Sequence, residues 1–179
     1  MEYRIRSARE SDIPHLPGIE QRASELFAST PFAVEAEASC LSEEFHREQV
    51  SMQLTWVAAD ADDTPVAFAA VVMLGGRPHL HELSVDPDHG RRGIGRRLVE
   101  AVCEWARAAG HGGVTLSTYR DVPWNAPFYE RMGFRVLAES ELDESLRDLR
   151  SEETRDGLDI AARVVMVRDL GPARTEDRH

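Results

Sequence analysis

The stretch that decides both the fold and the site is Leu83-Ser-Val-Asp-Pro-Asp-His-Gly-Arg-Arg-Gly-Ile-Gly-Arg-Arg-Leu-Val99. It starts as an apolar strand, turns through glycines and arginines, and continues as an amphipathic helix over 93–109. Glycine lets backbone approach a ligand closely, and the first amides of a helix lack partners within it. The stretch therefore predicts a phosphate or pyrophosphate at the helix start; solvated arginines beside an ordinary helix start are the alternative.

Two common phosphate-binding patterns are absent from this stretch. The nucleoside-triphosphate loop GxxxxGK[ST] needs a lysine, and all 21 basic residues of the chain are arginine. The glycines Gly90, Gly93 and Gly95 read GxxGxG, whereas dinucleotide-binding loops read GxGxxG. The spacing of the glycines alone therefore does not identify which phosphate-containing ligand binds.

Working outward, the periodicity of apolar residues predicts an α/β fold. We expect strands at 3–6, 54–59, 66–74, 80–85, 114–119, 134–138 and 160–167, and helices at 13–27, 34–50, 93–109, 125–132 and 142–153. Hairpins come first and βαβ crossovers later, which predicts a mixed, largely antiparallel sheet with helices on both faces. The prediction is a single domain over 1–170, followed by a disordered tail at 171–179.

Composition limits the class of protein. The 179 residues carry a net charge of −11 and are 42% hydrophobic, which is ordinary for a globular domain and argues against nucleic acid as a partner. The first residues show no apolar signal core behind a basic start, so we expect no signal peptide, and the longest apolar run, Val66–Leu74, is too short to span a bilayer. We expect a soluble, cytoplasmic protein with no membrane partner, in which Cys40 and Cys103 are reduced core thiols.

Two motifs together resemble a known family. Val85-Asp-Pro followed by Arg91-Arg-Gly-Ile-Gly-Arg resembles the acetyl-coenzyme-A pyrophosphate loop of the GCN5-related N-acetyltransferases (GNAT), and Asn125-Ala-Pro-Phe-Tyr-Glu-Arg-Met-Gly-Phe134 resembles their second motif. The motifs lie about 35 residues apart with a strand between them, as in that family. Recognisable motifs of the family lie within residues 78–136, and the order of predicted strands and helices resembles that of the family over about residues 1–168.

The resemblance implies acetyl-coenzyme A as co-substrate and no metal. The implied coenzyme-binding residues are Ser84, Val85, Arg91, Arg92, Gly93, Ile94, Gly95, Arg96 and Asn125. Amides near Ser84 and Val85 would hold the thioester carbonyl and stabilise its oxyanion. Two positions depart from the family: Gly90 stands where it has Arg or Gln, and Val122 where it commonly has Asn. Asn125 lies nearer the tyrosine, and capping of its own helix is the alternative role.

The resemblance also implies direct attack of an amine on the thioester, with two catalytic side chains. Tyr129 matches the tyrosine that protonates the leaving thiolate; a packed aromatic residue is the alternative. Glu82 lies on the strand before the loop and is the expected base, directly or through water, with a structural ion pair as the alternative. His81 is a further candidate for the base, whereas His79 and His81 alone are too few ligands for a metal.

The acceptor is the least defined part. Residues 1–63 carry thirteen acids against five arginines, which favours a cationic amine, although a solvated helix face explains the same charges. We expect a small-molecule amine (a polyamine, an amino sugar or an aromatic amine) in a pocket lined by His81, Phe32, Trp56 and Trp124. A protein N-terminus or another macromolecule, and a non-enzymatic acyl-coenzyme-A sensor, are the alternatives. A homodimer also stays open.

Overall fold

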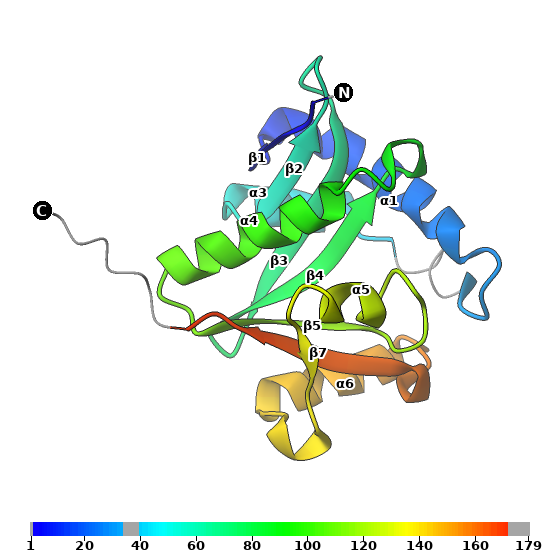
Figure 1. Ribbon diagram of the computed structural model, residues 1–179, viewed down its shortest axis with the longest axis vertical. Helices are drawn as coiled ribbons and strands as arrows, with labels where there is room; N and C mark the ends of the chain where they lie inside the picture. The colour runs from blue at the N-terminus through cyan, green and yellow to red at the C-terminus, as the bar shows by residue number, and fades with distance from the viewer. Residues whose placement is uncertain (1, 34–39, 172–179) are drawn as a thin grey trace, which may run out of the picture. The chain divides into compact units, whose positions relative to one another are not determined.

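A computed structural model of the chain describes residues 2–33 and 40–171. In that part of the chain, seven strands form one sheet in the order β1-β2-β3-β4-β5-β7-β6 (Figure 1). The strands are β1 Arg4–Ser7, β2 Thr55–Ala59, β3 Pro65–Leu74, β4 Arg77–Val85, β5 Gly113–Tyr119, β6 Arg135–Val136 and β7 Arg163–Asp169. The α-helices are α1 Leu16–Ser24, α3 Glu43–Ser51, α4 Ile94–Ala108, α5 Ala126–Glu130 and α6 Glu144–Arg155, and 3-10 turns cover Glu10–His15, Glu25–Phe27, Pro87–His89, Glu139–Glu141 and Ile160–Ala162.

The predicted fold class is confirmed, and the register explains why. Strands β1, β2 and β3 pair antiparallel, with Val57 of β2 opposite Phe68 of β3. The strand predicted at 66–74 is central and is buried from its first residue through Val71. Gly75 and Gly76 join β3 to β4 with φ of +54° and +78°, the geometry of a two-residue turn that glycine adopts without strain. Strands β4 and β5 pair in parallel.

Several predicted elements are shorter than expected. The helix predicted at 13–27 consists of a 3-10 turn, α1 and a second 3-10 turn. Pro14 and Pro17 lack the amide hydrogen that a continuous α-helix would use at these positions. Of the helix predicted at 34–50, residues 34–39 lie outside the described part of the chain, and α3 begins after Ser42, whose hydroxyl accepts a hydrogen bond from the Phe45 amide. The strand predicted at 134–138 keeps two residues. The predicted tail at 171–179 lies outside the described residues except for Gly171.

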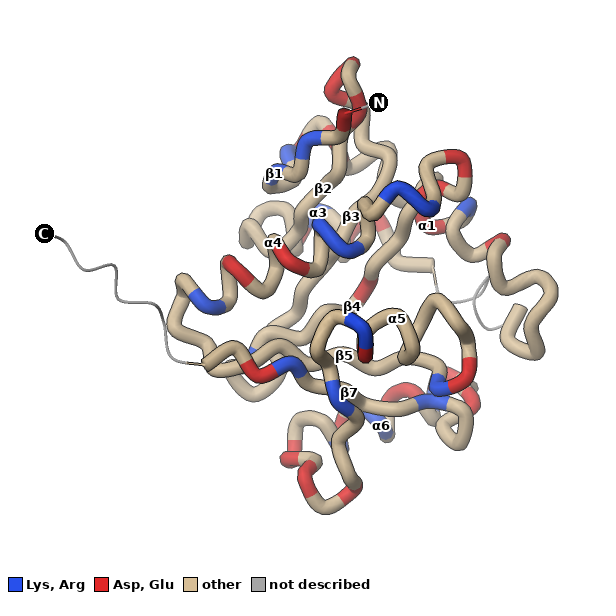
Figure 2. Tube along the Cα trace, in the orientation of Figure 1, with Lys and Arg blue, Asp and Glu red and all other residues tan. Residues whose placement is uncertain are grey.

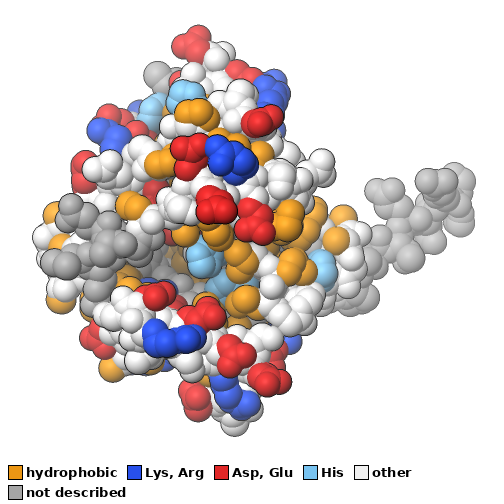
Figure 3. All heavy atoms as spheres, turned by 180° about the vertical axis from the view of Figure 1, so that it is seen from behind, with side chains coloured by type: hydrophobic (Ala, Val, Ile, Leu, Met, Phe, Trp, Pro, Cys, Tyr) orange, Lys and Arg blue, Asp and Glu red, His pale blue; other side chains and the backbone are white. Residues whose placement is uncertain are grey.

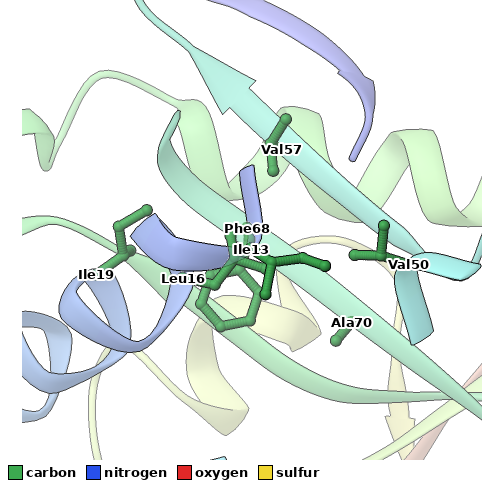
Figure 4. Packing of buried hydrophobic residues seen from close by; sticks show 7 residues of the cluster. All are labelled: Ile13, Leu16, Ile19, Val50, Val57, Phe68 and Ala70. Carbon is green, nitrogen blue, oxygen red and sulfur yellow. The ribbon is translucent and has the colours of Figure 1, made fainter. Parts of the chain in front are cut away.

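The chain forms two compact units, and the first contains Met1–Val72 and His81–Val102. Its core packs the first helices on strands β2 and β3 (Figure 4). The cluster consists of Ile13, Leu16, Ile19, Val50, Val57, Phe68 and Ala70. Leu16, Val57 and Phe68 are fully buried, so this core fixes the helices that precede β2 on the sheet.

The second unit contains Met73–Leu80 and Cys103–His179. Strand β5 pairs with β7 along its whole length, from Gly113 opposite Asp169 to Tyr119 opposite Arg163. Leu146 of α6 and Leu142, which precedes this helix, pack against Val165 of β7. Cys103 is fully buried here as predicted, whereas Cys40 of the first unit is exposed, so the core prediction for Cys40 is wrong.

A cluster of charged residues in the first unit connects β1 to the 3-10 turn that follows it and to the β2–β3 turn. Arg6 donates two hydrogen bonds to Asp12, at 2.6 and 3.0 Å, and also contacts Asp63 in the β2–β3 turn. Burial by itself raises the pKa of the Asp12 carboxyl, but the Arg6 hydrogen bonds and the Arg9 amide outweigh it, so this pKa lies below its ordinary value. The Asp12 carboxylate therefore stabilises the fold only in its charged form.

We predict that Asp12→Ala lowers the free energy of unfolding at pH 7 by about 2–3 kcal/mol, since it leaves the half-buried Arg6 without its main partner. Because the folded pKa is depressed, this stabilisation is present above the unfolded pKa of about 3.9 and is lost as pH falls through the folded value. Urea unfolding from pH 7 down to pH 3 measures both effects. The exposed Asp148→Ala is the control, and a difference that persists unchanged at pH 3 contradicts the assignment.

Candidate functional site

The start of α4 presents unpaired amides, as the sequence predicts. The first hydrogen bond of the helix runs from the Arg97 amide to the Gly93 carbonyl at 3.1 Å, so the amides of Ile94, Gly95 and Arg96 have no acceptor within the helix. Gly93 precedes them with φ of +75°, a conformation that glycine adopts freely. The Ile94 side chain is buried, which leaves only its backbone available to a ligand.

Positive charge surrounds these amides. Basic residues gather in the loop before α4 and in its first turn (Figure 2). Arg91 and Arg96 are exposed, and their side chains form no hydrogen bond or ion pair with any described residue. Two uncommitted guanidiniums beside three helix amides are an arrangement that suits a phosphate or pyrophosphate.

The other two arginines of the loop are held by Tyr3, a residue that the sequence patterns do not single out. The buried Tyr3 hydroxyl lies 2.9 Å from His89 Nδ1 and accepts a hydrogen bond of 2.9 Å from Arg92. Its carbonyl accepts a third bond, also 2.9 Å, from Arg97. Tyr3, which directly precedes β1, therefore connects this strand to the loop before α4 and to the first turn of that helix. The sequence predicts Arg92 as a coenzyme contact, and the structure gives it this second partner.

A second anchor comes from α1. Arg22 donates to both carboxylate oxygens of Asp86, at 2.8 and 3.2 Å, and to Asp88 at 2.8 Å. Burial alone raises the pKa of Asp86, but Arg22 and the Asp88 amide outweigh it, so the pKa lies below its ordinary value. The loop is thus fastened at its first residues by α1 and along its length by Tyr3.

Strand β4 carries Glu82 and Ser84 side by side. The Ser84 hydroxyl donates to Glu82 Oε1 at 2.7 Å, which orients the half-buried carboxylate. The Asp86 amide bonds to the Val66 carbonyl of β3, and amides of a strand alternate between its edges. The amide of Ser84 therefore faces β3, and that of Val85 faces the opposite edge. These contacts favour Val85 over Ser84 for the predicted role in holding a carbonyl.

The second unit carries Tyr129 on α5. Its side chain is buried, with edge contacts to Phe128 and Phe134 at ring distances of 5.1 and 5.6 Å. Asn125 is the N-cap residue of α5, but its side chain makes no capping hydrogen bond; its carbonyl accepts from the Phe128 and Tyr129 amides. A coenzyme contact by Asn125 stays a prediction. Val122 is buried and apolar, so it offers no substitute for the family's asparagine.

The predicted acceptor residues divide between the units. In the first, His81 is exposed with its ring 5.2 Å from that of Phe45, Phe32 is half-buried, and Trp56 is buried within β2. Trp124 belongs to the second unit and is 38% exposed. Histidine side chains are visible among hydrophobic and acidic ones on the face shown in Figure 3. Trp56 therefore contributes to the core, and its role in an acceptor pocket stays a prediction.

His79 has a structural partner rather than a ligand. It is buried, and its Nδ1 lies 2.9 Å from the Thr115 hydroxyl on the neighbouring strand β5. The described residues contain no group of three His, Cys, Asp or Glu side chains suited to a metal ion. Within the same residues, no helix is long and apolar enough to cross a membrane.

Comparison with known proteins identifies the family. The model of the acetyltransferase (GNAT) family matches residues 21–134. Peptidyl-lysine N-acetyltransferase YjaB of Salmonella typhimurium is 36% identical over 89 residues, covering 50% of this chain and 55% of that protein. The Escherichia coli YjaB is 30% identical over 131 residues, covering 69% and 83%. This chain therefore belongs to the GNAT family.

The fold agrees with that membership. The solved structure of N-acetylglutamate synthase from Neisseria gonorrhoeae, complexed with coenzyme A and N-acetyl-glutamate, superposes with a TM-score of 0.72 at 21% identity, covering 95% of this chain and 35% of that one. The match spans about half the length of the Salmonella relative and about a third of the Neisseria chain. The likeness to the solved structure concerns the fold alone.

We predict that Tyr3→Phe weakens coenzyme A binding about 3–10-fold, because it removes the hydroxyl that holds Arg92 and contacts His89. S-acetylpantetheine, which lacks the pyrophosphate, should bind equally to both proteins. Isothermal titration measures both ligands, and Tyr119→Phe, at the other tyrosine that the structure buries outside α5, is the control. Equal weakening of the two ligands would show that Tyr3 acts on the fold rather than on the loop.

Proposed function

We propose that this protein is an N-acetyltransferase that moves the acetyl group of acetyl-coenzyme A directly onto a primary amine. The observation that carries the proposal is the start of α4, where three helix amides and the uncommitted Arg91 and Arg96 fit a pyrophosphate. Membership of the GNAT family supports the same ligand.

Glu82 is the proposed base. An alkyl ammonium has a pKa of about 10.4, so it must lose a proton before it can attack the thioester. Glu82 would accept that proton, directly or through one water, and the Ser84 hydroxyl at 2.7 Å holds the carboxylate in one orientation. His81 remains the other candidate, since it is exposed on the same strand.

Two further groups complete the proposed reaction. The nitrogen forms a bond to the thioester carbon, and the oxygen of the resulting tetrahedral intermediate would accept a hydrogen bond from the edge amide of Val85. As the carbon–sulfur bond breaks, the Tyr129 hydroxyl would protonate the leaving thiolate, and the products are the acetylated amine and coenzyme A. The aromatic contacts of Tyr129 fix its ring for this role.

The acceptor amine is proposed in two forms. A small-molecule amine, cationic at neutral pH, is the first, because residues 1–63 carry an excess of acids. The second is the side-chain amine of a lysine in a protein, and the resemblance to two peptidyl-lysine N-acetyltransferases favours it. Both acceptors present a primary alkyl ammonium to the same base.

Release of free thiol from acetyl-coenzyme A tests the activity and the acceptor together. The panel contains polyamines, amino sugars, aromatic amines, lysine peptides with blocked N-termini, and peptides with a free N-terminus. We expect small primary amines to raise the rate well above hydrolysis. A rate increase with peptides alone would identify the macromolecular acceptor. Tight coenzyme binding with no acceptor would favour an acyl-coenzyme-A sensor, and absence of binding would contradict the whole proposal.

We predict that Glu82→Gln and Tyr129→Phe each lower kcat about 100-fold while the dissociation constant of coenzyme A stays within twofold. Steady-state kinetics and titration of the coenzyme measure these effects. Full turnover by Tyr129→Phe would show that another group protonates the thiolate.

A further inference from the structure

The second unit contains a cavity of about 210 Å³ that the proposed acetyl transfer does not use. The residues that line it combine apolar ones, such as Leu137, Leu142 and Val165, with Arg120, Arg150 and Arg163. The volume lies below the range of about 300–1,000 Å³ that holds drug-sized ligands, so a ligand here must be a small metabolite.

The charges around this cavity are unequal. Arg163 donates to Glu153 Oε1 at 2.9 and 3.1 Å, and Arg150 lies 3.6 Å from Oε2 of the same carboxylate. The side chains of Arg150, Arg163 and Glu153 are 20%, 13% and 8% exposed. Two largely buried guanidiniums therefore share one carboxylate, and one positive charge there lacks a counter-ion among the described residues.

Rigid positioning accompanies this excess charge. Arg150 donates to the carbonyls of Arg163 and Ile160, at 3.3 and 3.1 Å. The guanidinium of Arg163 also lies 4.7 Å from the centre of the Tyr119 ring and donates to the Ser117 carbonyl. Each guanidinium has five N–H groups, and these contacts leave donors on both arginines unused. Two fixed donors with spare hydrogen-bonding capacity suit a planar anion such as a carboxylate.

Arg120 adds a third, uncommitted cation. It follows β5, is exposed, and its side chain forms no hydrogen bond or ion pair with any described residue. Glu139 supplies the opposing charge on the cavity wall. Together with Glu153, which pairs with Arg150 and Arg163, the three arginines are matched by two carboxylates, so the site as a whole favours one negative charge.

We propose that this cavity binds a small organic anion, with a carboxylate or phosphate against Arg120, Arg150 and Arg163 and a short apolar body against the aliphatic wall. The anion supplies the missing counter-charge for the two half-buried arginines. The proposal concerns the second unit alone and does not depend on the identity of the acetyl acceptor.

Titration of the 179-residue chain with 4-methylpentanoate tests the site, and the uncharged 4-methylpentanamide is the matched ligand. We expect saturable binding of the carboxylate and at least tenfold weaker binding of the amide. Arg120→Gln should weaken carboxylate binding at least fivefold, whereas Arg147→Gln, an exposed arginine on α6, should leave it unchanged. Both positions are exposed, so neither change threatens folding.

Inorganic phosphate distinguishes the two sources of the anion. It is titrated with coenzyme A present at saturation, so that the arginines before α4 are already engaged. If phosphate binds and Arg120→Gln weakens that binding, the site is supported and recognises the charged group alone. If the carboxylate binds and phosphate does not, the ligand of the site is an organic acid. The proposal is overturned by absence of saturable binding of either anion, by equal binding of carboxylate and amide, or by carboxylate binding unaffected by Arg120→Gln.

Discussion

Burial of the apolar face of α4 is the constraint on which the loop before this helix depends. Ile94, Leu98, Val99 and Val102 are at most 1% exposed, so the helix cannot rotate or slide without exposing them. With the helix fixed, its first amides take one direction, and Gly93 turns the chain into it. The site thus owes its geometry to packing rather than to any property of the arginines themselves.

Long-range contacts then hold the loop that packing alone would leave mobile. A turn containing Gly90 and Gly93 has few conformational restraints of its own. Tyr3 and Arg22 supply them from β1 and α1, through hydrogen bonds to His89, Arg92 and Asp86. The same interactions occupy Arg92 and Arg97, so the four loop arginines divide into two that position the loop and two that are available to phosphate.

The sequence predicts elements and motifs well, and partners between distant residues poorly. The strands, α4 and its loop follow from periodicity and glycine spacing, which are local signals. Tyr3 contacts His89 and Arg92, which follow it in the sequence by 86 and 89 positions. The alternating pattern Tyr-Arg-Ile-Arg gives no sign of these contacts. The sequence also predicts that Ser84 acts through its amide. In the structure that amide faces β3, and the Ser84 hydroxyl instead contacts Glu82; neither contact can be read from the sequence. The acceptor pocket is the least predictable, as the buried Trp56 shows.

The charges of the first unit show why composition alone is a weak guide to an acceptor. Of its acids, Asp12 and Asp63 hold Arg6, and the pKa of each lies below its ordinary value because of neighbouring arginines, although burial opposes this shift at Asp12. Glu20 is buried; both its oxygens accept from the Leu41 amide, and it lies 3.7 Å from the buried His46. These carboxylates stabilise the fold and cannot attract a substrate as well. The attraction expected for a cationic amine must therefore come from the exposed acids, such as Glu25, Glu44 and Glu48, where salt screens it over about 8–10 Å.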